Sequence, residues 1–182
     1  MPRFRLSLIA AVVIGLCADH VAAQEIGPDD RAAIAARIDA LGQVMSAGDM
    51  AGALDVIPPR LLQATAARFG ATEEQLRQAF AEAAAGMMAG VAIVSYDMDL
   101  DAATTHLTPD GARTYLLVPT ETVMEVDGAG RVRAFSQTLA MEEGGQWYLV
   151  RVVDPAQRAM LGEVYPEFVG VDFPAGAMTT AD

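Results

Sequence analysis

The chain has 182 residues, 53% of them hydrophobic, and a formal net charge of −12 at pH 7. That length is typical of one domain that buries its own core. The strong negative charge argues against binding to nucleic acid or to anionic lipid headgroups, so we expect neither as a partner.

The first 23 residues have the pattern of a secretory signal peptide. Two arginines precede an apolar run that ends at Cys17, and small residues lead up to Ala23. The run is too short to form a stable membrane span. We therefore expect cleavage after Ala23 and a periplasmic or secreted bacterial protein. The alternative is a lipoprotein signal in which Cys17 is lipidated.

Export would remove Cys17, which is the only cysteine of the chain. The remaining chain would then have no disulfide, no thiolate nucleophile and no cysteine metal ligand. His106 would be its only histidine, which excludes zinc or iron sites that need two histidines. We expect no cofactor, and we expect His106 at the surface beside a turn.

Three helical stretches are predicted before residue 90. The first runs from Pro28 until Gly48. The second runs from Asp49 to Gly70 and is interrupted by two prolines. The third begins with a capping box at 72–75. The core-facing stripe expected for this third helix consists of Leu76, Ala79, Phe80, Ala83 and Met87.

After residue 90 the hydrophobic pattern changes to the period of two that is typical of strands. Turn-forming residues separate four predicted strands, at about 91–107, 112–126, 131–142 and 147–153. A short helix from Asp154 to about Glu163 follows. The sequence therefore predicts a single α+β domain at 24–175, with N-terminal helices packed on a curved four-stranded antiparallel meander. Residues 176–182 are expected to form a flexible tail.

If every connecting turn has four residues, counting residues outward from each turn gives the pairing between neighbouring strands. Asp97 then pairs with Thr122, and Thr122 pairs with Phe135 of the third strand. The acids, threonines and arginines share one face with Phe135. The opposite face is more apolar and includes Tyr96 and Trp147, so we assign it to the helices.

Alternating aspartates in the sequence SYDMDLD raise the question of a metal site. Asp97, Asp99 and Asp101 recur at every second residue, as acids do at the start of an EF-hand loop. The glycine and glutamate that such a loop needs are replaced by Ala102 and Thr108. Carboxylates along one strand face also lie too far apart to close on one ion. We interpret the three aspartates as the solvated face of a strand, with a weak cation site as the alternative.

One carboxylate is a candidate catalytic group. Glu121 follows Pro119 on the side expected to face the helices, where Tyr96 and Tyr115 could donate hydrogen bonds to it. A carboxyl group in an apolar pocket can act as a general acid or base. The alternative is that Glu121 lies at a strand bulge and points to water.

An apolar patch on the second sheet face could support a homodimer unless the C-terminal helix covers it. Its residues are Phe135, Leu139, Val150 and Val152.

Two segments resemble the nuclear transport factor 2-like superfamily, in which helices pack into a curved antiparallel sheet to form a cone. MSAGDMAGALDVIPPRLL (45–62) is similar to the early helical passage of that superfamily, and GGQWYLVRV (144–152) is similar to its closing strand. Together with LGEVYPEFVGVDFP (161–174), they also resemble small exported bacterial proteins of unknown function. The resemblance implies a cone-like fold and transfers no catalytic residue.

The sequence shows no convergent set of catalytic residues. The leading hypothesis is therefore a non-enzymatic exported domain that binds a small apolar ligand or a protein of the cell envelope. The alternative is a cone-fold isomerase or hydrolase that uses Glu121 and a tyrosine.

Overall fold

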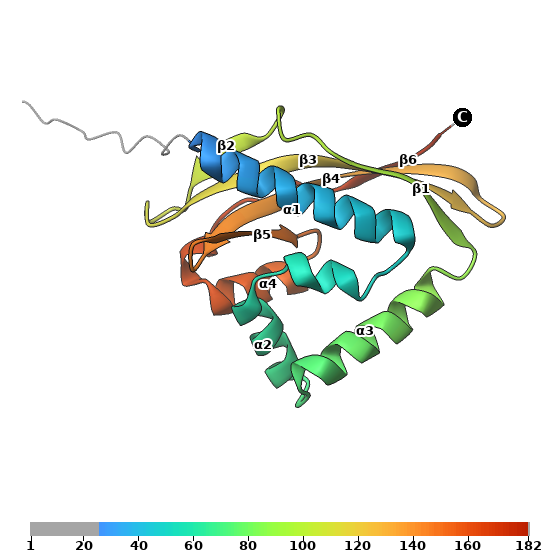
Figure 1. The fold of residues 1–182 in the computed structure, drawn as a ribbon, viewed down its shortest axis with the longest axis horizontal. Coiled ribbons are helices and arrows are strands. Elements are labelled where there is room, and N and C mark those ends of the chain that lie inside the picture. Colours follow the sequence, from blue (N-terminus) through green and yellow to red (C-terminus); the bar gives the residue numbers. More distant parts are fainter. Residues whose placement is uncertain (1–25, 182) are drawn as a thin grey trace, which may run out of the picture.

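The computed structural model describes residues 26–181. Helices lie against a curled antiparallel sheet, which forms a half-barrel (Figure 1). The expected α+β, cone-like class is confirmed. The predicted signal peptide lies outside the described residues. The helical elements are α1 (Pro28–Ala47), η1 (Gly52–Val56), α2 (Pro59–Arg68), α3 (Glu73–Met87), α4 (Pro155–Val164) and η2 (Pro166–Phe168).

The helix ends follow the local signals in the sequence. In the α3 capping box, the Thr72 hydroxyl accepts a hydrogen bond from the Gln75 amide at 3.2 Å, and the Gln75 side chain accepts one from the Thr72 amide at 2.9 Å. Helix α1 ends at Gly48, whose φ of 70° is a conformation that glycine adopts without a side-chain penalty. The predicted second helix is divided: η1 precedes the two prolines, and α2 begins at Pro59.

The sheet is built around one long hairpin that carries two short strands on each side. It has six strands rather than the expected four: β1 (Val91–Met98), β2 (Thr104–Leu107), β3 (Thr114–Val126), β4 (Gly130–Glu143), β5 (Gln146–Arg151) and β6 (Ala177–Thr180). Strands β1 and β2 both pair with β3, while β5 and β6 both pair with β4. The predicted first strand is therefore two strands. The expected flexible tail contributes β6.

The counted register is correct only between β4 and β5. There Glu143 pairs with Gln146 across two glycines. The turn between β3 and β4 has three residues, so Glu121 rather than Thr122 pairs with Phe135. That one-residue shift places Thr120 and Thr122 on the α1 side of β3, contrary to the prediction. Asp97 accordingly pairs with Glu121 and not with Thr122.

The loop between β2 and β3 closes between Thr108 and Arg113, later than the sequence predicts, and its own side chains hold it in place. The Asp110 carboxylate accepts hydrogen bonds from the Thr108 hydroxyl at 2.7 Å and from the Ala112 amide at 3.0 Å. The Thr108 hydroxyl oxygen also accepts a bond from the Arg113 amide at 3.0 Å. The Thr108 amide also donates a backbone hydrogen bond to the Arg113 carbonyl at 2.9 Å. The register therefore differs by two residues from the expected pairing of residue 107 with residue 112, since Leu107 pairs with Thr114.

Helix α1 covers one face of the sheet. Ile34 and Leu41 from α1 pack with Val118, Ala140 and Leu149 from three strands, and all five side chains are buried. At the end of this contact the Trp147 indole N–H donates a hydrogen bond to the Asp30 carboxylate at 2.9 Å. Tyr96 and Met98 of β1 pack against the same cluster, as predicted.

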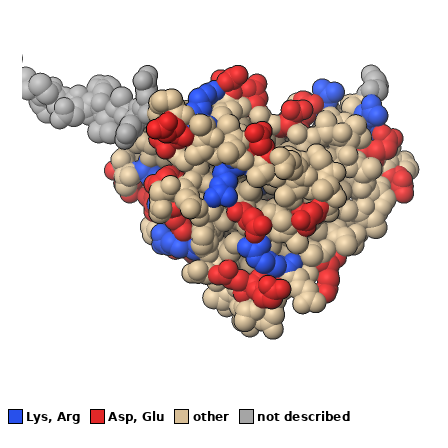
Figure 2. Space-filling view, viewed as in Figure 1, with Lys and Arg blue, Asp and Glu red and all other residues tan. Residues whose placement is uncertain are grey.

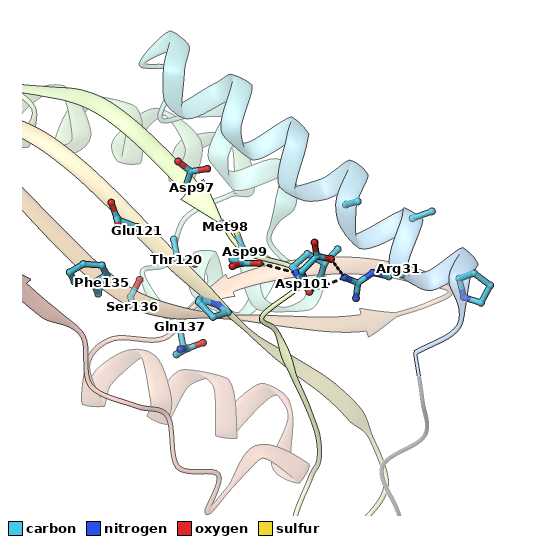
Figure 3. Close-up of a pocket in the computed structure, with 15 residues that line it drawn as sticks. Arg31, Asp97, Met98, Asp99, Asp101, Thr120, Glu121, Phe135, Ser136 and Gln137 are labelled. Carbon is cyan, nitrogen blue, oxygen red and sulfur yellow. Dashed lines mark hydrogen bonds and ion pairs between the residues drawn. The ribbon is translucent and has the colours of Figure 1, made fainter.

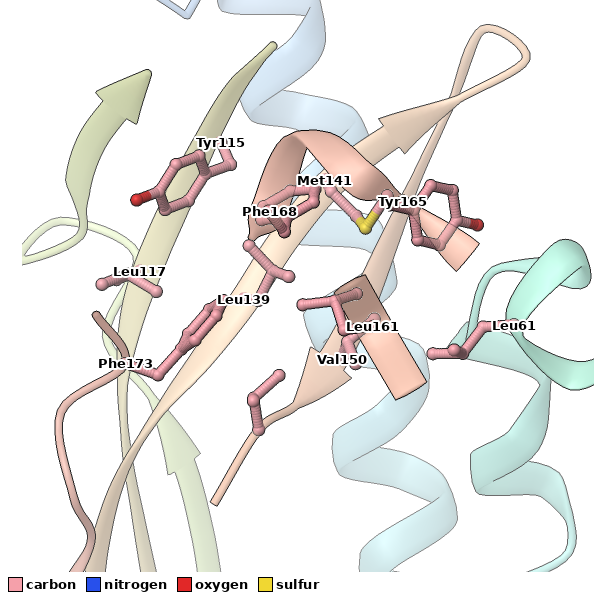
Figure 4. Close-up of a cluster of buried hydrophobic side chains, with 11 residues drawn as sticks. Leu61, Tyr115, Leu117, Leu139, Met141, Val150, Leu161, Tyr165, Phe168 and Phe173 are labelled. Carbon is pink, nitrogen blue, oxygen red and sulfur yellow. The ribbon is translucent and has the colours of Figure 1, made fainter. Parts of the chain in front are cut away.

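The opposite face is covered by α4, η2 and the segment that follows them (Figure 4). Leu161, Phe168 and Phe173 pack there on Leu139 and Leu117 of the long hairpin. Three residues of the predicted dimer patch, Leu139, Val150 and Val152, are buried in this cluster. Only Phe135 of the patch is exposed. The C-terminal elements therefore occupy the surface on which the expected dimer interface depended.

Helix α3 departs from its predicted role. Figure 1 shows it apart from the face of the sheet, with its N-terminal end near α2 and its C-terminal end leading to β1. Ala84 is its only buried residue, and Met87 is 70% exposed. The apolar stripe that predicted core packing is thus largely exposed. A helical pattern predicts an apolar face, but it does not show what covers that face.

Candidate functional site

An open cleft of about 1100 Å³ lies at the end of β1 and is lined by the first turns of α1 and by neighbouring residues of β3 and β4 (Figure 3). It forms where β1 stops pairing at Met98 and the chain turns away from β3 before β2 begins. Its lining contains four carboxylates and one arginine among apolar and neutral polar groups. The lining residues are Pro28, Arg31, Ala32, Ala35, Asp97, Met98, Asp99, Leu100, Asp101, Pro119, Thr120, Glu121, Phe135, Ser136 and Gln137.

The three alternating aspartates have three different environments. The Asp99 carboxylate closes the turn after β1 by accepting hydrogen bonds from the amides of Asp101 at 3.0 Å and Ala102 at 2.9 Å. Asp101 forms an ion pair with Arg31 of α1. Asp97 lies on the strand beside Glu121. All three aspartates are exposed. In residues 26–181 no group of three or more metal-ligating side chains is placed to hold an ion.

Asp97, Glu121 and Phe135 form a row across β1, β3 and β4 (Figure 3). Two carboxylates directly opposite each other on neighbouring strands repel. Arg133 offsets part of this repulsion through a contact with Glu121 at 3.5 Å. Within the described part of the chain, no ion pair includes Asp97. The Phe135 side chain, which is 41% exposed, supplies an aromatic surface beside the two acids.

The candidate catalytic residues do not converge. Glu121 lies on the sheet face opposite α1 and is half-buried, contrary to the expectation that it faces the helices. Tyr96 lies on the α1 side, where burial raises the pKa of its hydroxyl. Tyr115 is buried beside Phe168, with 5.3 Å between the ring centroids. Neither tyrosine lines the cleft.

His106 is half-buried rather than fully exposed. Its ring stacks on Tyr115, with 5.3 Å between the centroids, and its Nε2 atom lies 2.8 Å from the Thr104 hydroxyl. No carboxylate is hydrogen-bonded to it within the described residues. The contacts are those of a packed side chain beside a turn.

A polar cluster at the C-terminal side was not predicted from the sequence. The Tyr165 hydroxyl donates a hydrogen bond to Glu143, and burial together with this carboxylate raises the pKa of Tyr165. Arg113 forms an ion pair with Glu167 at 2.8 Å, and Arg60 lies over the Tyr165 ring at 4.8 Å. These contacts hold η2 against the end of the β3–β4 hairpin. They join residues far apart in the chain, so no local sequence pattern indicates them.

Acidic side chains are spread over the face seen in Figure 2, with arginines among them. Of the helices in residues 26–181, none is both long and apolar enough to cross a membrane. No protein-family model matches the chain, and no curated protein matches it.

Substitutions of the aspartates separate their roles. We predict that Asp97→Asn raises the free energy of unfolding by a few tenths of a kcal/mol, because it removes the repulsion with Glu121. Asp99→Ala should lower it by about 1 kcal/mol, because two turn amides lose their acceptor. Urea unfolding at low salt measures both changes. Equal destabilisation by the two substitutions would contradict these roles.

Proposed function

We propose that this chain is an exported, non-enzymatic binding domain whose ligand is a small organic cation with an apolar part. The observation that carries the proposal is the cleft, in which carboxylates and an exposed aromatic ring share one wall. The proposal keeps the expectation of a small ligand and adds a positive charge to it.

The charges of the cleft support a cationic ligand. Asp101 is paired with Arg31, and Glu121 contacts Arg133 at 3.5 Å. Asp97 adds a further negative charge directly opposite Glu121. A bound ammonium or amidinium group would reduce the repulsion between these two carboxylates. The two carboxylates repel each other when no ligand is bound. Removing this repulsion would contribute to the free energy of ligand binding.

The apolar part of the ligand would contact Phe135. An aromatic face attracts cations and also buries hydrocarbon. Pro119 adds to the apolar lining of the cleft. Ligand sites commonly combine such a surface with a small number of charged groups that fix the orientation of the ligand.

The enzymatic alternative has no supporting observation in the structure. A cone-fold isomerase or hydrolase would need Glu121 and a tyrosine to face a common cavity. Tyr96 is instead on the opposite side of the sheet, and Tyr115 is packed among aromatic rings. We therefore do not assign a reaction to the cleft.

We also propose membership of the nuclear transport factor 2-like superfamily and a location in the bacterial periplasm or outside the cell. The half-barrel sheet with packed helices supports the superfamily membership. The basic residues and the apolar run within residues 1–23 support the location in the periplasm or outside the cell.

Ligand binding can be tested with two probes of the same shape and opposite charge. Benzylammonium should shift the ¹⁵N–¹H resonances around 97–101 and at Thr120, Glu121 and Phe135, whereas benzoate should leave them unchanged. Asp97→Asn should weaken benzylammonium binding by about two- to fivefold, the usual range for one exposed charge.

Asp39→Asn is the matched control because Asp39 is exposed on α1 and is not part of the cleft lining. It removes the same charge and should leave the affinity unchanged. Equal shifts with benzoate would refute a cation site. Equal weakening by both substitutions would show a general charge effect instead of binding in the cleft.

Export can be tested by expressing the full chain in a bacterium. We predict that the protein is recovered from the periplasm or the medium with a mass that begins at Gln24. A version that lacks 2–23 should stay in the cytoplasm and serves as the control. A cytoplasmic product that retains all 182 residues would contradict the prediction.

A further inference from the structure

Strand β6 occupies an edge of β4 that β5 leaves open. Strand β5 pairs with β4 only over 138–143, whereas β6 pairs with it over Val132–Phe135. The connection to β6 is short: Phe173 is buried in the C-terminal cluster, and only 174–176 separate it from the strand. Within residues 26–181, Phe173 is the last side chain that belongs to a hydrophobic cluster.

Backbone hydrogen bonds are the main attachment of β6. All four of its side chains are exposed, and Met178 is 69% exposed. The amide of Ala181 adds one more bond, to the Arg131 carbonyl at 2.9 Å. No side chain of the strand contributes to either hydrophobic cluster. A short strand without buried side chains detaches at low free-energy cost.

The β4 edge fits the segment that already lies on it. A Cβ atom at Gly176 would lie 3.0 Å from the Phe135 carbonyl oxygen, so the backbone approaches closely there and a larger residue would not fit without a shift. Every copy of this protein carries the same matching segment. The β6 strand of a second copy therefore fits the β4 edge in the same way as the chain's own β6 strand.

We propose that the C-terminal strand exchanges between two copies of this protein. The strand 177–180 of each copy leaves its own β4 and adds to β4 of the other, which gives a symmetric strand-swapped dimer. The β6–β4 contacts are the same in the monomer and the dimer, so the equilibrium depends on protein concentration and on the hinge at 174–176.

The short hinge constrains the geometry of this dimer. Three residues span at most about 10 Å, so the two β4 edges must lie close together around a two-fold axis. The exchanged Ala177 would lie opposite Phe135 of the other copy, at the border of the cleft. The exchange does not require a ligand in the cleft, so it stands independently of the proposed binding function.

Cysteine trapping tests the exchange in the full chain. Ala134 and Met178 are direct partners across β4 and β6, and a disulfide can join such neighbours. Ala134→Cys and Met178→Cys are placed in separate chains, each with Cys17→Ser to remove the only native thiol. The two chains are mixed at high concentration and oxidised with diamide. We expect a heterodimer whose cross-linked peptides join 134 of one chain to 178 of the other.

Two controls make the result specific. Val91→Cys and Val126→Cys, which are also direct partners, involve a strand inside the chain and should give no heterodimer above background. Gly176→Val in both chains should reduce the 134–178 product several-fold. If Ala134→Cys impairs folding, Arg133→Cys with Thr179→Cys repeats the test on the other face of the same pair. Absence of the heterodimer, or 178–178 products alone, would overturn the proposal.

Discussion

The unequal lengths of the strands determine how this fold is built. Strands β3 and β4 form a hairpin about 45 Å long, which extends farther than any element that packs on it. Near the open end of the hairpin both faces are covered, by α1 on one side and by α4 and η2 on the other. Val118 and Leu139 are fully buried there. Toward the turn, the C-terminal elements no longer cover the second face, and Phe135 and Arg133 are exposed.

The uncovered part of the hairpin contains both proposed binding features. The cleft lies where β1 ends beside Pro119, and the β6 edge begins at Phe135 of the neighbouring strand. Phe135 belongs to both features. The covered part supplies the stability, since its two clusters contain most of the large buried side chains. The uncovered part can therefore carry repelling charges and a weakly held strand without loss of the fold.

Local sequence signals predicted the elements well. The capping box at Thr72, the glycine that ends α1 and the register across the glycines between β4 and β5 each depend on neighbouring residues, so the sequence alone was sufficient for them. The predicted pairing between β3 and β4 was wrong, because their turn has three residues and not the expected four. This difference places Glu121 on the opposite face of the sheet. The register between β2 and β3 also differs from the count, because the bonds of Thr108 with Asp110 and Arg113 close that loop later than the sequence predicts.

Long-range features could not be predicted in this way. The exposed stripe of α3 has the same pattern as a buried one, and only the tertiary structure distinguishes the two. The contacts of Tyr165 with Glu143 and Arg60 join segments distant in the chain. The candidate site was predicted in part: the three aspartates are exposed as expected, but only Asp97 lies on a strand, because β1 ends at Met98. The pairing of Asp97 with Glu121, and of Glu121 with Phe135, follows only from the true register.

Amide hydrogen exchange measured along β3 and β4 tests most directly whether the hairpin has a covered and an uncovered part. If it does, the amides that pair within 114–118 and 138–143 exchange only through global unfolding. Those that pair within 120–126 and 130–135 exchange faster through local opening, beginning on the β6 side. Equal protection along both strands would contradict this division and would remove the physical basis for a weakly held β6.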